Sequence, residues 1–216
     1  MPNVITLDMN HPAVQCLCKK DKRLAKVIEM VGPIQYTPHD EDSYSFLIHE
    51  IIEQMLSVKV DQKIYGRLDD LCGGDISQNT IHCLTDEQIR STGTSNAKVG
   101  YIRNITDAIK DGTLDFERLK QLSDREVIAS LTKIRGIGNW TAKMYLIFVL
   151  NRQDIFPYED GAFLQSYRWL YKTEDCSPAA IKAKCKKWSP YSSVAARYMY
   201  RALDMGLTKE KFHLYK

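Results

Sequence analysis

Two glycines lie where one helical pattern of apolar residues gives way to the next. A helical pattern runs into Arg135-Gly136-Ile137-Gly138, and a second runs from Trp140 to Leu150, which predicts a hairpin between two helices. Because glycine has no Cβ, the backbone N–H groups of such a hairpin can approach a phosphate, and the outgoing helix adds positive charge from its N-terminus. Such a contact positions a duplex regardless of its base sequence. The alternative is an ordinary glycine-containing turn.

A single carboxylate follows the second helical pattern closely. Asp160 lies three residues after Pro157 and directly before Gly161. An aspartate in such a turn usually forms the turn itself or caps a helix. It can instead stabilise positive charge that develops on a substrate, and align or deprotonate an attacking water. These residues alone leave both interpretations open, with Glu159 as a neighbouring candidate.

The stretch from Ile134 to Asp160 resembles the helix-hairpin-helix DNA glycosylase superfamily, whose pattern is a Gly-x-Gly hairpin, an apolar helix, and a Pro or Gly followed by an essential aspartate. Two motifs in this stretch are similar to the 3-methyladenine DNA glycosylase II branch: Gly136-Ile-Gly-Asn-Trp-Thr-Ala-x-Met144 and Asp154-Ile-Phe-Pro-x-x-Asp160. Weaker matches cover most of the chain, namely Gln54-Met-Leu-Ser57, Gly93-x-Ser95-x-x-Lys98-x-x-Tyr101-Ile102 and Trp188-x-Pro190-Tyr191-x-Ser193-x-Ala195. The resemblance implies an all-α, two-lobed fold with the active site in the cleft between the lobes.

The same resemblance implies an enzyme that flips an alkylated base, such as 3-methyladenine, out of double-stranded DNA and hydrolyses its N-glycosidic bond. This reaction passes through a cation-like sugar, so it requires a carboxylate beside the sugar, and the family pattern gives that role to Asp160. Relatives that also cut the strand use a lysine at the position held here by Trp140, and an indole cannot form a Schiff base. The resemblance therefore implies a monofunctional glycosylase without lyase activity.

Further residues are implied to hold the base and the duplex. Trp140 and Tyr200, with Met144 nearby, would form the base pocket, since electron-rich rings interact favourably with a positively charged alkylated base. Met55, with Gln54 beside it, would enter the gap left by the flipped base as an apolar wedge. The alternative for the two aromatic residues and for Met55 is a place in the core.

The resemblance also assigns the backbone contacts of the hairpin. The phosphate-binding residues would be Arg135, Gly136, Ile137, Gly138 and Thr141. Backbone carbonyls would hold a Na+ or K+ ion, namely those of Thr132, Ile134 and Ile137, and no other cofactor is required. Two departures bear on the shape of the pocket: Ser192 stands where relatives often have an arginine, and Met144 stands where they can have an aromatic residue.

The composition is that of an ordinary globular protein, with 216 residues, 44% hydrophobic and 26% charged. The net charge of +3 permits DNA binding without indicating it, so a localised basic face would have to supply the contact. No apolar run could span a bilayer and no signal pattern begins the chain, which predicts a cytoplasmic monomer without a membrane partner. The six cysteines include no Cys-x-x-Cys pair, which argues against a zinc site and an iron–sulfur cluster.

Strand-like alternation is scarce, so the chain is predicted to be almost wholly α-helical. Caps and apolar spacing predict helices over 22–31, 44–56, 96–110 and 192–205, and helix starts near 86, 124 and 178. The run Val4–Leu7 is the one β-capable segment singled out. We expect residues 1–42, which end in the acidic turn 39–42, to pack with the C-terminal lobe. Residues 43–150 would form a helical bundle ending in the hairpin, and residues 151–216 would complete the second lobe.

Two other functions stay open. One is a glycosylase of the same fold that removes oxidised or mismatched bases. The other is a non-catalytic DNA-binding module that keeps the hairpin as a phosphate clamp. Asp160 discriminates against the second, because a clamp has no use for a carboxylate facing anionic DNA.

Overall fold

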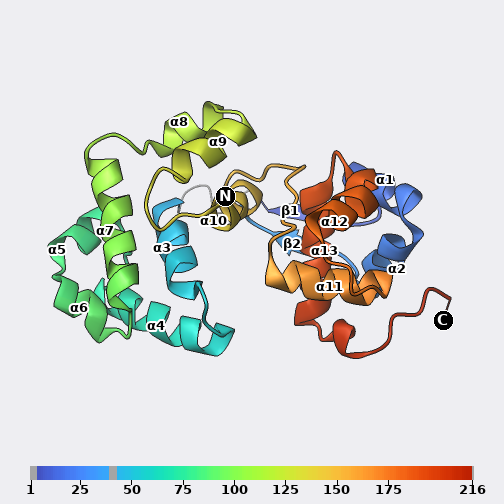
Figure 1. The fold of residues 1–216 in the computed structure, drawn as a ribbon, viewed down its shortest axis with the longest axis horizontal. Coiled ribbons are helices and arrows are strands. Elements are labelled where there is room, and N and C mark those ends of the chain that lie inside the picture. Colours follow the sequence, from blue (N-terminus) through green and yellow to red (C-terminus); the bar gives the residue numbers. More distant parts are fainter. Residues whose placement is uncertain (1–3, 39–42, 216) are drawn as a thin grey trace. The chain divides into compact units, whose positions relative to one another are not determined.

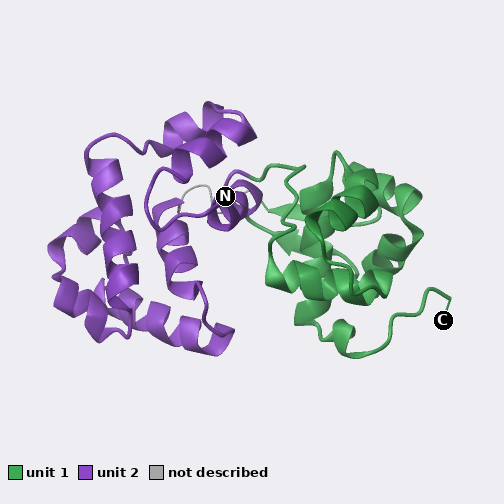
Figure 2. Ribbon diagram, in the orientation of Figure 1, with its two compact units in different colours: residues 1–38, 151–216 green, residues 39–150 purple. Residues whose placement is uncertain are grey.

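A computed structural model describes residues 4–38 and 43–215 and is helical in nearly all of its regular structure (Figure 1). The chain divides into two compact units, one made of residues 1–38 and 151–216 and the other of residues 39–150 (Figure 2). The predicted acidic turn at 39–42 lies outside the described residues. Within the described ranges, no helix combines the length and the apolar character needed to cross a bilayer.

The first unit is a helical core with a small sheet. Its elements are β1 (Ile5–Leu7), α1 (Pro12–Lys20), α2 (Lys22–Val31), β2 (Ile34–Tyr36), α11 (Gly161–Tyr171), α12 (Pro178–Cys185), the 3-10 turn η2 (Lys186–Trp188), α13 (Ser192–Asp204) and the 3-10 turn η3 (Leu207–Lys209). β1 and β2 pair antiparallel, with Ile5 opposite Tyr36. The β-capable run Val4–Leu7 thus contains a strand, which begins at Ile5. Its partner β2 was not predicted, because its three residues carry too little alternation to reveal a strand.

Asp21 forms the polar centre of this unit. Its side chain is 2% exposed and caps α2 as predicted. Its Oδ2 also accepts hydrogen bonds from the Tyr171 hydroxyl and, at 2.9 Å, from Trp188 Nε1. The same oxygen forms an ion pair with Lys187 Nζ at 3.0 Å. Burial on its own would raise the pKa of Asp21, but these hydrogen bonds and the Lys187 charge hold it below its ordinary value. One carboxylate thus joins α2, α11 and η2.

The second unit contains α3 (Ser43–Glu53), α4 (Val58–Leu71), α5 (Gln78–Cys83), α6 (Asp86–Ser91), α7 (Asn96–Lys110), α8 (Phe116–Gln121), α9 (Asp124–Leu131), α10 (Asn139–Met144) and the π-helical turn η1 (Tyr145–Val149). The predicted capping boxes at Thr85 and Ser123 are confirmed at the starts of α6 and α9. The predicted helix over 44–56 is wrong at its end. It stops at Glu53, because Met55 adopts a left-handed backbone with φ 61 that an α-helix cannot contain.

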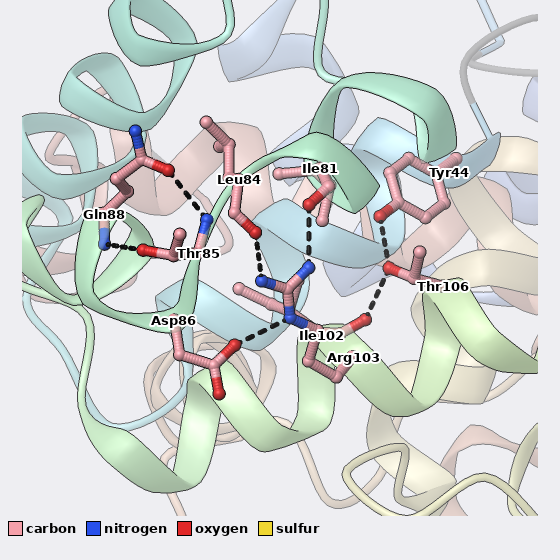
Figure 3. Close-up of polar contacts among 9 residues, drawn as sticks. All are labelled: Tyr44, Ile81, Leu84, Thr85, Asp86, Gln88, Ile102, Arg103 and Thr106. Atoms are coloured by element: carbon pink, nitrogen blue, oxygen red, sulfur yellow. Dashed lines mark hydrogen bonds and ion pairs between the residues drawn. The ribbon is translucent and has the colours of Figure 1, made fainter.

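The central helix α7 holds the two short helices α5 and α6 through Arg103 (Figure 3). Its Nη1 and Nη2 donate to the carbonyls of Ile81 and Leu84 at 2.7 and 2.5 Å, and its Nε donates to Asp86 Oδ1 at 2.8 Å. Carbonyls at the end of a helix lack partners within the helix, so Arg103 satisfies the end of α5 while it binds the start of α6. This makes α7 a fixed support for the segments that pack on it.

Candidate active site

Asp160 is the N-cap of α11, where its backbone is extended with φ −78 and ψ 127. Its Oδ1 accepts a hydrogen bond from the backbone N–H of Phe163 at 2.7 Å, and its own N–H donates to the carbonyl of Pro157 at 3.0 Å. The Asp160 side chain is 7% exposed, whereas Glu159 is exposed. The capping alternative is thus realised, and it holds the carboxylate in one orientation at the positive end of a helix dipole.

The turn that precedes Asp160 is anchored by aromatic side chains. Phe156 meets Phe163 and Trp188 edge-to-face, with ring centroids 5.3 and 6.0 Å apart. The Lys182 ammonium lies 4.1 Å from the centroid of the Tyr158 ring. Edge-to-face pairs and cation–π contacts each add to the burial of the rings, so the backbone on which Asp160 stands is firmly packed.

α13 is joined to the same segment by hydrogen bonds to Asp154 and Ile155. Asp154 Oδ1 accepts from the backbone N–H of Ser192 at 3.1 Å and from its hydroxyl at 2.6 Å. Ser193 Oγ accepts from the N–H of Ile155 at 2.9 Å. The start of α13 is therefore held by a serine–aspartate pair at Ser192, one of the two departures from the family resemblance noted in the sequence.

Arg197 lies one turn before the half-buried Tyr200 on α13 and was not singled out by the sequence. It is 9% exposed, and its Cζ lies 3.8 Å from the centroid of the Tyr36 ring. Burial lowers the pKa of Arg197, whereas Tyr36 and Tyr200 act in the opposite direction. Tyr36 in turn donates to Asn151 Oδ1 at 2.9 Å. Because Tyr36 and Arg197 are far apart in the chain, no sequence pattern could reveal this cation–π pair.

The hairpin is anchored by the two isoleucines that flank its turn. Ile134 and Ile137 are 6% and 4% exposed, and the N–H of Ile137 donates to the carbonyl of Ile134 at 3.0 Å. Arg135 between them is exposed, while its carbonyl accepts from Asn104 Nδ2 of α7 at 2.9 Å. The buried isoleucines and the Asn104 hydrogen bond thus fix the turn to the second unit, while the Arg135 side chain is exposed to solvent.

The two glycines of the hairpin are required for different reasons. Gly136 has φ +113, and a Cβ there would lie 2.5 Å from Cβ and Cγ of Tyr101, so the fold itself requires glycine. Gly138, the N-cap of α10, has φ −94, and a Cβ there would meet nothing within 4 Å. The fold does not require glycine at 138, but a bare backbone there leaves room for a ligand to approach.

The other predicted hairpin and pocket residues lie on α10. Trp140 in its first turn is half-buried, while Thr141 and Met144 are 1% and 4% exposed. The Thr141 side chain therefore lies inside the unit, and its backbone N–H, at the third position of the helix, is the group that could reach a phosphate. Lys143 is also buried, at 9% exposure.

The wedge candidate Met55 is fully exposed, at 101% of its reference area, so the core alternative is wrong for this residue. The neighbouring Gln54 donates from Nε2 to the carbonyl of Gly136 at 3.1 Å. The structure thus brings Gln54, next to Met55 in the chain, to the hairpin of the second unit, while Asp160 and Tyr200 belong to the first. The expected cleft between the lobes stays a prediction.

A glycine hairpin that exposes its backbone, followed by a buried aspartate at the start of a helix, defines a class of helical DNA repair proteins. Residues 48–190 match the HhH-GPD superfamily of base excision DNA repair proteins, and the chain belongs to this superfamily. The resemblance drawn from the hairpin and the Asp160 motif is therefore confirmed.

Individual relatives match along most of their length. The chain is 29% identical over 189 residues to DNA-3-methyladenine glycosylase 1 of Schizosaccharomyces pombe, which is 84% of this chain and 82% of that protein. The crystal structure of DNA-3-methyladenine glycosidase from Bacillus halodurans superposes with a TM-score of 0.83 at 32% identity over 97% of both chains. The structure of S. pombe 3-methyladenine DNA glycosylase (Mag1) in complex with abasic DNA gives a TM-score of 0.82 at 26% identity, over 95% of this chain and 100% of that one. These similarities confirm the predicted all-α helix-hairpin-helix glycosylase fold.

Proposed function

We propose that the protein is a monofunctional DNA glycosylase that removes alkylated bases such as 3-methyladenine from double-stranded DNA. Its place in the base excision superfamily and its similarity to proteins of S. pombe and B. halodurans named as 3-methyladenine glycosylases or glycosidases support the reaction and the class of base. The observation that carries the chemistry is the buried, oriented carboxylate of Asp160 at the start of α11.

Asp160 would act on the sugar. As the bond to the base lengthens, positive charge develops on the sugar ring, and a carboxylate already held in place stabilises it without reorganising. Its Oδ1 is fixed by the N–H of Phe163. The same carboxylate would align the attacking water or take its proton. Glu159 is exposed, whereas Asp160 is buried, and we assign Glu159 no role in the reaction.

Trp140 and Tyr200 are the aromatic residues that we propose to stack on the flipped base. Stacking of an electron-rich ring on a positively charged alkylated base contributes about 0.5–2 kcal/mol. Met144, four residues after Trp140 on one face of α10, would support the ring from inside the unit. Met55, exposed on its left-handed backbone, would fill the gap in the duplex, and inserted apolar side chains are a known means of holding unstacked bases apart.

The hairpin would bind the DNA backbone and carry no base information. The exposed Arg135 and the open backbone at Gly138 are the features that suit a phosphate. Carbonyl oxygens are suitable ligands for Na+ or K+. We propose that the carbonyls of Thr132, Ile134 and Ile137 bind one such ion at the hairpin. The carbonyl of Ile134 already accepts one hydrogen bond, and a second lone pair can serve a cation.

The product would be an intact strand with an abasic site. Strand cleavage by this family requires an amine at the position of Trp140, and the next amine on α10, Lys143, is 9% exposed. We also propose that the protein is a monomer and that it acts on double-stranded DNA in the cytoplasm. Size-exclusion chromatography with light scattering measures the oligomeric state.

The proposal is tested by release of free base from a matched set of duplexes that carry 3-methyladenine, 7-methylguanine, 8-oxoguanine or a mismatch. We expect release of the alkylated bases, strand breaks only after heat or alkali, and no covalent complex trapped by borohydride. Release confined to 8-oxoguanine or mismatched bases would support the other glycosylase function, and binding without any release would support a non-catalytic module. Trapping that is lost in Lys143→Ala would contradict the monofunctional assignment.

A further inference from the structure

The residue at the tip of the α3–α4 loop has a backbone that favours glycine and a side chain that favours burial. Met55 has φ 61 and is fully exposed. Residues other than glycine are uncommon in this left-handed conformation, where the Cβ crowds the backbone. A large apolar residue in such a place gives the fold nothing by burial, which points to a function for the side chain itself.

The loop is fastened from the side of α7 by Lys98. The ammonium of this half-buried residue donates to the carbonyl of Ile52 at 2.8 Å and to the carbonyl of Gln54 at 2.6 Å. These carbonyls lie at and just beyond the C-terminus of α3, where the helix leaves its last carbonyls without partners and where a positive charge is favourable. Lys98 therefore fixes the backbone on the N-terminal side of Met55.

The loop is fastened to the hairpin by Gln54, whose Nε2 donates to the carbonyl of Gly136 at 3.1 Å. The two helices that the loop connects are also joined to each other: Nε2 of His49 on α3 lies 2.9 Å from Oδ2 of Asp61 on α4. All of these contacts lie inside one compact unit. The tip is consequently held at a set distance from the hairpin.

We propose that Lys98 and Gln54 are positioning residues that hold Met55 out of the core and at a fixed offset from the hairpin. This inference rests on the proposed function, in which the hairpin binds a phosphate and Met55 enters the duplex. When the hairpin has bound its phosphate, the Gln54–Gly136 contact sets which gap Met55 can reach. The Lys98 contacts keep the loop in its left-handed turn, so little ordering remains to be done when the side chain inserts.

The test compares affinities for two duplexes, one intact and one carrying a tetrahydrofuran abasic-site analogue, which presents the gap without any reaction. Lys98→Met keeps the alkyl stem and removes both hydrogen bonds, and Gln54→Leu removes the contact to Gly136. Each should lower the preference for the abasic duplex by about three- to tenfold, which is the lower part of the range usual for coupled neighbouring residues. Lys98→Arg, which can still donate to both carbonyls, should retain most of the preference. Lys110→Met, the same change at an exposed position of α7, should retain all of it.

Repeating both substitutions in a Met55→Ala background separates positioning from general stability. If Lys98 and Gln54 act through Met55, their effect on the preference disappears once the wedge is removed. Effects of equal size in both backgrounds, or no effect with Met55 present, would overturn the inference. Should Lys98→Met fail to fold, Gln54→Leu gives the same comparison. A wild-type protein that prefers the abasic duplex but releases no alkylated base would contradict the proposed function and leave this inference standing, whereas a wild type without the preference would overturn the inference.

Discussion

Replacing Met55 with glycine should make the protein more stable and less active. Relief of the left-handed conformation at φ 61 contributes about 1–2 kcal/mol, and the greater freedom of glycine in the unfolded chain removes about 0.5–1 kcal/mol. The side chain is fully exposed, so no burial is lost. The net gain lies between about 0 and 1.5 kcal/mol, or up to about 6 °C in Tm for a chain of this size. Excision should fall at least about tenfold, because unstacking and flipping a base costs a few kcal/mol that the wedge helps to offset.

Lys172 provides the matched control. It is a second exposed non-glycine residue with a left-handed backbone, φ 53, and it caps α11. Lys172→Gly should give a similar gain in stability with unchanged excision. Urea unfolding gives the stability of each variant. Single-turnover base release at saturating enzyme gives the activity, and saturation removes any effect that the lost Lys172 charge has on DNA affinity. Full excision by Met55→Gly would refute the wedge, and a less stable Met55→Gly would refute the reasoning about the backbone.

Three further outcomes follow from the structure. Gly138→Ala should lower the free energy of unfolding by no more than about 1 kcal/mol, the cost of alanine at a helix N-cap, since a Cβ there meets nothing within 4 Å, yet it should weaken binding to damaged and undamaged duplexes by the same factor. A loss confined to the damaged duplex, measured by fluorescence anisotropy, would contradict a phosphate contact. Replacing Na+ and K+ with a bulky organic cation at constant ionic strength should give a weaker form of the same non-selective defect, and unchanged affinity would count against the cation site. Asp21, whose pKa is lowered in the fold, should contribute stability that is complete above its ordinary value of about 3.9 and is lost as the pH falls through its lowered pKa. Asp21→Asn should therefore cost about 3 kcal/mol near neutral pH and flatten the acid side of the stability profile, and an unchanged profile from pH 2 to 7 would contradict this.

Local signals in the sequence were enough for the helix starts and for the hairpin. Capping boxes at Thr85 and Ser123 lie within four residues, and the apolar spacing of α7 gave both of its ends. The end of α3 was missed because apolar residues continue past it to Leu56. The spacing alone cannot show that Met55 turns left-handed, since long-range contacts from Lys98 hold that turn.

The candidate site divides in the same way. Asp160, Gly136 and Gly138 were found because their family pattern lies within one short stretch. The cation–π contact between Arg197 and Tyr36 and the hydrogen bond between Ser192 and Asp154 join residues far apart in the chain. Such pairs are visible only once the chain is folded. The burial of Thr141 and Met144 likewise depends on which side of α10 faces the unit.

The central claim is that the Asp160 carboxylate acts on the sugar in the transition state. Asp160→Asn can still accept the hydrogen bond from Phe163 N–H through its amide oxygen, so α11 should remain capped while the negative charge is lost. Single-turnover release of 3-methyladenine should fall to the uncatalysed level in this variant, with affinity for the abasic-analogue duplex largely retained, whereas Glu159→Gln should release base at close to the wild-type rate. Near-normal release by Asp160→Asn, or its loss in Glu159→Gln, would contradict the assignment.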